Sequence, residues 1–274
     1  MSIKRFKPVT PSLRHRTIID RSYLWKGGPF KKLVVGMHKV GGRNHHGRIT
    51  VRHRGGGHKR LYRIIDFKRS LLQVQGQITR FEYDPNRSSW IALILYENGS
   101  ISYILAPDGV KQGDFVLASK DQGTPVKKGN SLSLKHVPIG SLIHNVELKP
   151  GKGGQIIRSA GTSGRVIQKK EGYCMVRLPS GTLRLIPSTC MATIGVVSNS
   201  EHHHINEGKA GHRRWLGIRP TVRGTAMNPI DHPHGGGEGK TSGGRPSVTP
   251  WGRPTKGKPT RSKRKKNPFL VRTI

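Results

Sequence analysis

The sequence has few residues of the kinds that build large cores, disulfide frameworks or membrane spans. Apolar residues make up 32% of the 274 residues, compared with roughly 45–50%, glycine included, in an ordinary globular domain. No stretch approaches the roughly 20 apolar residues that cross a bilayer, and the start, Met1 to Pro8, lacks the apolar segment of a secretory signal. The two cysteines, Cys174 and Cys190, are too few for a disulfide framework and predict reduced intracellular thiols.

Acidic residues are also scarce, with 14 Asp and Glu against 50 Lys and Arg, which gives a net charge of +36. A charge of this size destabilises a compact monomer through self-repulsion, so we expect a polyanionic partner. Nucleic acid fits best, because Lys and Arg release counterions when they neutralise phosphates. A membrane surface would favour a basic amphipathic helix, which the sequence lacks, and no membrane partner is expected.

The charge is concentrated at the two ends of the chain. Asp20 is the one acid before residue 61, and none follows Glu238. The ends therefore resemble basic arms, and the middle resembles an ordinary folded protein. Residues 201–274 are rich in Gly, Pro, Lys and Arg, so we expect this tail to be disordered alone and ordered on its partner.

The middle carries two sets of short strand signals, each of which predicts a small β-barrel. Asn98-Gly99 marks a hairpin turn in the first set. The first set covers residues 77–83, 90–96, 101–105 and 115–117. The second covers residues 142–148, 155–157, 165–167, 173–178, 182–186 and 192–197. Short helices are expected only near residues 33–37 and 208–211.

Three patterns suggest chemistry at first sight. Residues 239–241, Gly-Lys-Thr, end like a phosphate-binding Walker loop, but the required first glycine is His234. Histidines cluster at 45–46, 202–204 and around His232, yet no spacing matches a zinc motif, so we predict no metal site. Asp231-His232 could form an acid–base pair, or Asp231 could orient the turn while His232 hydrogen-bonds a partner.

Glycine-rich basic loops are the strongest functional signal. Residues 41–48 and 52–60 interleave glycine with Arg, Lys and His. Glycine allows close approach of another backbone, and the basic side chains donate to phosphate. Tyr62, Trp215 and Trp251 lie near basic residues, where they could stack on bases. A solvated flexible loop is the alternative, which the recurrence of such loops disfavours. Without a helix–turn–helix or zinc-finger pattern, RNA fits better than DNA.

Distinctive motifs lie along most of the chain, at residues 52–60, 82–87, 151–154, 227–240, 248–252 and 255–257. Together they resemble the motifs of the ribosomal protein L-two family of the large subunit, in its bacterial and mitochondrial form. The resemblance covers residues from about Pro8 to the end, and Leu24-Trp25-Lys26 with residues 239–245 suggests the alphaproteobacterial and mitochondrial branch.

The resemblance implies a mostly β fold in four parts. These are a basic N-terminal extension (1–41), an OB-fold RNA-binding domain (42–120), an SH3-like barrel (121–200) and a basic Gly/Pro-rich C-terminal extension (201–274). Residues 201–205 and 267–274 depart from the family pattern, which leaves their local contacts open.

The resemblance also implies a non-enzymatic role in translation. The expected partners are large-subunit ribosomal RNA near the peptidyl-transferase centre, neighbouring ribosomal proteins, and the small subunit at the inter-subunit face. No cofactor is expected, and any Mg²⁺ would come with bound RNA. The expected location is a ribosome in a bacterial cytoplasm or a mitochondrial matrix.

In the family, the histidine at the His232 position is associated with peptidyl-transferase activity, and we interpret His232 as an organiser of RNA. Asp231 and His232 form the predicted functional tip, within residues 228–240. The full set of predicted RNA-binding residues is Arg43, His46, Arg48, Arg52, His53, Arg54, His58, Lys59, Arg60, Lys152, Arg213, Arg214, Trp215, Arg219, Arg223, Asn228, His232, His234, Lys240 and Trp251.

Two other classes of protein remain as alternatives. A DNA-binding architectural protein predicts heptads, lysine-rich repeats or a recognition helix, and retention of duplex DNA rather than ribosomal RNA would identify it. An NTPase is disfavoured by His234, and a nucleotide-binding titration would test it.

Overall fold

The computed structural model describes residues 3–121, 123–257, 260, 262 and 267–271. The remaining residues of the two expected basic extensions lie outside the described part. The chain divides into two compact units: the first takes the residues up to His38, Lys59–Lys209 and those from Pro268 on, and the second takes Lys39–His58 and Ala210–Asn267. None of the helices among the described residues has the length and apolar character of a membrane span.

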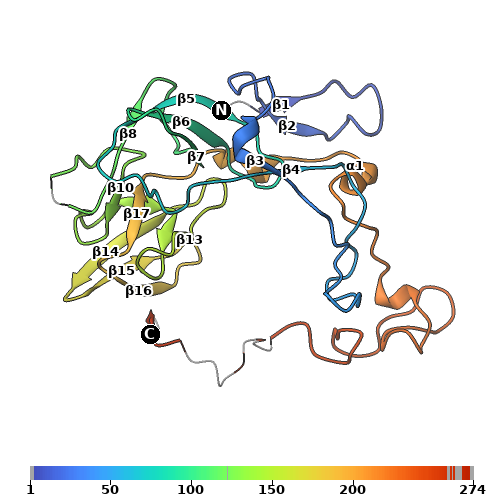
Figure 1. The fold of residues 1–274 in the computed structure, drawn as a ribbon. Helices are drawn as coiled ribbons and strands as arrows, with labels where there is room; N and C mark the ends of the chain where they lie inside the picture. Colours follow the sequence, from blue (N-terminus) through green and yellow to red (C-terminus); the bar gives the residue numbers. More distant parts are fainter. Residues whose placement is uncertain (1–2, 122, 258–259, 261, 263–266, 272–274) are drawn as a thin grey trace. The chain divides into compact units, whose positions relative to one another are not determined.

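The first unit contains a four-stranded antiparallel sheet in the order β7-β6-β5-β8. Figure 1 shows β5, β6 and β7 side by side. A bulge at Thr79 shifts the register between β5 and β6. The strand signals of the first set are confirmed by β5 (Gly76–Glu82), β6 (Ile91–Tyr96), β7 (Ile101–Leu105) and β8 (Phe115–Val116).

Strand β6 is apolar throughout because both faces of this sheet are covered. Ile91 and Leu93 belong to one buried cluster, whereas Ala92 and Ile94 belong to another. Successive side chains of a strand alternate between faces, so a strand covered on both sides reads as a continuous apolar run. The sheet is therefore the middle layer of its domain.

Part of the expected N-terminal extension packs on this sheet. Ile19 and Leu24 are buried in the cluster that contains Ala92, and β1 (Ile3–Arg5) pairs with β2 (Thr17–Ile19). Another pair joins β3 (Val34–Gly36) to β4 (Leu61–Arg63). The apolar residues that anchor this segment occur in groups of two or three between basic residues. Such short groups give no strand pattern in the sequence, so this packing was not predicted.

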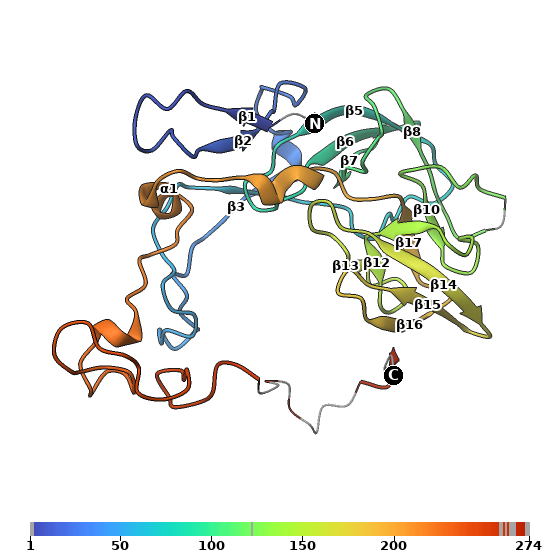
Figure 2. The ribbon, with the colours of Figure 1, turned by 180° about the vertical axis from the view of Figure 1, so that it is seen from behind.

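The second sheet has eight strands in the order β18-β16-β15-β14-β11-β17-β10-β9. Figure 2 shows β14, β15 and β16 side by side from behind. Its strands are β9 (Ala118–Ser119), β10 (Ser131–Ser133), β11 (Leu142–His144), β14 (Gly164–Lys170), β15 (Tyr173–Arg177), β16 (Leu183–Pro187), β17 (Met191–Ile194) and β18 (Leu270–Val271). A short pair, β12 (Val146–Glu147) and β13 (Gly154–Ile156), completes this part. The mostly β fold class and the strands of the second set are confirmed.

The core of the second sheet contains both cysteines. Cys174 and Cys190 are free thiols and fully buried. Burial raises the pKa of Cys190 to about 12, so this thiol stays neutral and packs as a small apolar group. His144, also fully buried, donates from Nδ1 to the Gly195 carbonyl at 3.0 Å.

The described helices are short. They are the 3₁₀ turns η1 (Lys31–Leu33), η2 (Ser200–His204) and η3 (Gly224–Ala226), and the α-helix α1 (Ala210–Trp215). The helix expected near residues 208–211 begins at Ala210. The prediction of a helix at residues 33–37 is wrong over residues 34–36, where strand β3 forms. The β-branched Val34 and Val35 favour an extended strand, which pairs with β4.

Candidate nucleic-acid interface

All but three of the predicted RNA-binding residues lie in the second unit. Lys59, Arg60 and Lys152 belong to the first unit, and all the others, with Asp231, belong to the second. Most are exposed; the exceptions, half-buried or buried, are His53, Arg60, His232 and His234. The second unit therefore presents a dense set of cationic and aromatic side chains to solvent.

Four arginines surround a cavity in the second unit. Arg43, Arg52, Arg54 and Arg219, together with His53, line a cavity of about 420 Å³. The guanidinium groups come from the loop at 41–54 and from the segment after α1. Several guanidinium forks around one hollow suit the bidentate recognition of phosphate.

Glycines hold these two segments together by letting their backbones touch. A Cβ on Gly57 would lie 2.6 Å from the Gly217 nitrogen. Gly55 donates its N–H to the Gly217 carbonyl at 3.0 Å, and His58 donates to the Trp215 carbonyl at 2.9 Å. The glycines of the basic loop therefore approach the chain's own backbone, whereas the sequence suggested approach to a partner's backbone.

Lys39 and Trp251 fix the loop further. The Lys39 ammonium donates to three successive carbonyls, including Gly56 at 3.0 Å and Gly57 at 2.9 Å. The Arg52 guanidinium lies 5.0 Å from the centre of the Trp251 ring. Sequence reasoning missed Lys39, because an isolated lysine before a glycine-rich loop carries no distinctive pattern.

The predicted tip is built around two stacked histidines. The rings of His232 and His234 lie 5.1 Å apart between centroids. The His234 backbone N–H donates to Nδ1 of His232 at 3.0 Å, and the Val248 N–H donates to Nε2 of His234 at 2.9 Å. Each of these contacts uses the lone pair of the ring nitrogen that accepts it, so the backbone of the loop fixes the orientation of both rings.

Close packing leaves the His232 ring little access to solvent. Its exposed fraction is 7%, and a Cβ on Gly224 would lie 2.4 Å from the His232 Cε1 atom. Asp231 is exposed, and the Nδ1 atom of His232 is occupied by the His234 N–H rather than by this carboxylate. Ile230 is 93% exposed, and residues 228–231 form one exposed segment of the tip, while residues 237–240 form another.

Lys152 sits in a loop of the first unit that is shaped by a buried carboxylate. Glu147 accepts backbone N–H groups from Gly153 at 2.8 Å, Met191 at 3.0 Å and Gly151 at 3.3 Å. The fully buried carboxylate is thus satisfied within the fold. The Lys152 side chain is exposed at the end of this loop.

The histidine clusters and the Walker-like residues can be compared with the described part of the fold. No group of three or more His, Cys, Asp or Glu side chains in the described part could hold a metal ion. After Lys240 the chain forms bends rather than the helix that a Walker loop requires, and the Thr241 hydroxyl bonds the Gly236 carbonyl at 3.2 Å.

Comparison with known families gives two matches that together cover most of the chain. Residues 30–118 match "Ribosomal Proteins L2, RNA binding N-terminal domain", and residues 127–252 match "Ribosomal Proteins L2, C-terminal domain". The two large sheets therefore fall mostly within one family of ribosomal proteins.

Individual relatives agree over nearly the whole length. The chain is 59% identical over 272 residues to the large ribosomal subunit protein uL2 of Rickettsia canadensis, covering 99% of each chain. It is 60% identical to uL2m of Reclinomonas americana, covering 99% of this chain and 98% of the relative. It is 58% identical to uL2 of Rickettsia bellii. The chain therefore belongs to the L2 family of proteins of the large ribosomal subunit.

Proposed function

We propose that this chain is a non-enzymatic structural component that binds large-subunit ribosomal RNA near the peptidyl-transferase centre and supports association of the two subunits. Its relatives are large-subunit proteins of bacteria and of a mitochondrion, so its ribosome works in a bacterial cytoplasm or a mitochondrial matrix. The arrangement of the second unit supports the RNA-binding role: arginine forks around one cavity, and a glycine-rich tip held by two histidines.

The histidine pair carries the proposal for the tip. A general base needs an unprotonated nitrogen that can reach the proton it abstracts. Here the accepting nitrogens of His232 and His234 both bind backbone N–H groups of the chain itself. We therefore infer that His232 acts by fixing the loop that presents Asn228–Asp231 to RNA, and that the RNA carries out peptide-bond formation.

Paired substitutions at His232 test this role. Asn places an amide oxygen where Nδ1 stands, whereas Gln places it nearer the Nε2 position, and neither titrates near neutral pH. His232→Asn is therefore expected to support peptide-bond formation near the normal rate in reconstituted large subunits. His232→Gln leaves a buried N–H unsatisfied, at a cost of roughly 1–3 kcal/mol, and should lower the rate about tenfold. Single-turnover peptide-bond formation over a range of pH measures both.

His234 provides the reciprocal control, since its accepting atom is Nε2. There Gln should be tolerated and Asn should not. Equal loss with His232→Asn and His232→Gln would show that the imidazole itself is needed. Normal rates with both variants and with His232→Ala would show that His232 has no role in activity.

The inter-subunit role has a separate test. Large subunits reconstituted without this chain are expected to join small subunits less completely than subunits that contain it, as measured by sedimentation. Equal joining would remove subunit association from the proposed function and leave the RNA-binding role intact.

A further inference from the structure

A second cavity lies beside the four-stranded sheet, where the chain before β3 passes the edge of β5. Its volume is about 790 Å³, which is within the range of small-molecule sites. Strand β8 pairs with β5 at residues 76–77. From Thr79 on, the edge of β5 that faces β8 pairs with no other described strand. The segment around Trp25 lies there instead, and the Trp25 N–H donates to the Phe81 carbonyl at 2.8 Å.

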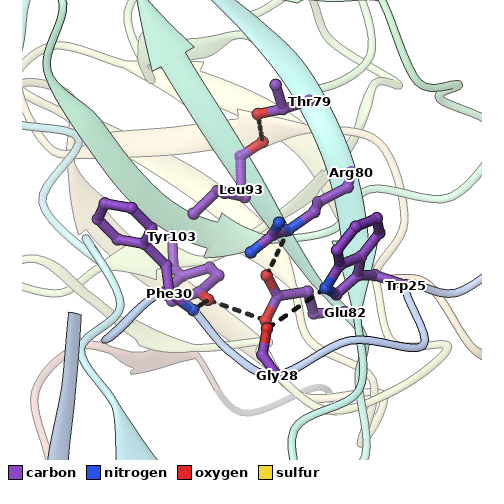
Figure 3. Close-up of polar contacts among 8 residues, drawn as sticks. All are labelled: Trp25, Gly28, Phe30, Thr79, Arg80, Glu82, Leu93 and Tyr103. Carbon is purple, nitrogen blue, oxygen red and sulfur yellow. Dashed lines mark hydrogen bonds and ion pairs between the residues drawn. The ribbon is translucent and has the colours of Figure 1, made fainter. Parts of the chain in front are cut away.

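The central group of this cavity is the Arg80 guanidinium, which is held from two sides (Figure 3). Its Nε atom donates to the Glu82 carboxylate at 2.8 Å, and its centre lies 4.5 Å from the Trp25 ring. The Arg80 side chain is 23% exposed and lines the cavity. Because Nε is engaged, the two terminal nitrogens are the part of the fork that can meet a ligand.

Buried groups hold Glu82 in turn. The hydroxyl of the fully buried Tyr103 donates to the second Glu82 oxygen at 2.8 Å, and the Phe30 N–H donates to that hydroxyl at 2.8 Å. Burial raises the pKa of Tyr103 to about 12, so this hydroxyl keeps its proton at neutral pH. The chain of bonds fixes the direction of the guanidinium, as a preorganised binding group requires.

The Trp25 ring is also fixed by its neighbours. Its indole N–H donates to the Gly28 carbonyl at 3.3 Å, and a Cβ on Gly27 would lie 2.5 Å from the indole nitrogen. Trp25 is nevertheless 49% exposed. A large aromatic ring that is fixed by its neighbours and left half open to a cavity is suited to contact a flat ligand.

The lining of the cavity matches the three parts of a nucleotide. Trp25 and Tyr23 offer aromatic surface to the face of a base, and the Gln112 amide offers a donor and an acceptor to its edge. Arg80 and Lys26 offer positive charge to a phosphate. The described residues that line the cavity include two cations, Lys26 and Arg80, and no acid, so the charge of the site favours an anion.

We propose that this cavity receives one unstacked nucleotide of the large-subunit ribosomal RNA. The proposal rests on the proposed RNA-binding function and adds a site to it. Half of the cavity, residues 23–27, lies before the matched RNA-binding domain, which starts at residue 30. The aromatic wall is therefore supplied by a segment outside the region that defines the family's RNA-binding domain.

Base-specific chemical probing of large-subunit RNA bound to the full chain tests the site. The wild-type chain is expected to protect one unpaired base that Trp25→Ala exposes, with at least about a fivefold rise in its modification, while all other protections persist. Gly27→Val should have the same effect, because its side chain would displace the indole. Phe115→Ala, which removes an exposed aromatic ring from the same sheet but outside the cavity, should change nothing at this base.

Three results would contradict the nucleotide site. A wild-type footprint that neither Trp25→Ala nor Gly27→Val alters would overturn the nucleotide site alone, provided that urea unfolding shows both variants folded. The absence of any wild-type footprint would overturn the proposed function as well. In assembled large subunits, a photoreactive residue at position 25 is expected to crosslink to RNA, and crosslinking to a neighbouring protein instead would overturn the site.

Discussion

Doubling the salt concentration from about 0.1 M to 0.2 M is expected to weaken binding of the full chain to large-subunit RNA roughly 500-fold. With 14 acids against 50 Lys and Arg residues, at least 36 positive charges have no internal counterpart even if every acid is paired. If about ten of them meet phosphates, the slope of log K against log salt is roughly −9. A filter-binding or fluorescence titration over a series of salt concentrations measures this slope.

The arginine cavity of the second unit is expected to contribute a defined share of that slope. Replacing Arg43, Arg52, Arg54 and Arg219 by Gln should make the slope shallower by about four, since each lost phosphate contact reduces it by about one. Lys170→Gln, an exposed change at the end of β14, serves as the control and should leave it unaltered. A wild-type slope shallower than about −3 would contradict the electrostatic account.

Acidification from pH 7 to pH 4 is expected to remove about 3 kcal/mol of stability through His144 alone. Burial, with a smaller contribution from the Arg69 charge, lowers the pKa of His144 from 6.5 to about 4. The folded state therefore favours neutral His144. Its contribution is fully present above pH 6.5 and is lost as the pH falls from 6.5 through 4, because the unfolded chain binds the proton first.

Matched variants separate this effect from the other groups that titrate over the same range. His144→Asn keeps a donor for the Gly195 carbonyl and cannot titrate, so its free energy of unfolding should depend less steeply on pH than that of the wild type. His203→Asn is the control: that histidine also contacts a backbone carbonyl through Nδ1 at 3.0 Å, but is exposed. Urea unfolding at several pH values measures both. Parallel curves for His144→Asn and wild type would refute the assignment to His144.

Strand positions were predictable because their signals are local. The apolar run that became β6 and the Asn98-Gly99 turn that follows it depend on residues within a few positions of one another. The pairs β1–β2 and β3–β4 were not predictable in the same way. Their strands have three residues each and are separated by 11 and 24 residues, so no short window contains both partners.

The candidate sites also have features that the sequence predicts and features that only the fold determines. The sequence alone predicted the basic loops and the candidate tip at His232, because composition and motif spacing are properties of the linear chain. Which ring nitrogen of His232 accepts a hydrogen bond did not follow, since Val248 and Gly224 reach the histidine pair only through the fold of the loop. The same holds for the Arg80 cavity, which joins Trp25 to a strand more than fifty residues later.

The sequence by itself determined that this chain carries a large unbalanced positive charge, consists mainly of short strands and shares the motifs of one ribosomal family. Charge, periodicity and motif spacing are properties of the linear chain. Only the tertiary structure decided that Gly57 approaches the chain's own Gly217, that backbone N–H groups donate to the rings of two histidines, and that Trp25 stacks on Arg80. Each of these depends on contacts between segments whose proximity is set by packing rather than by sequence.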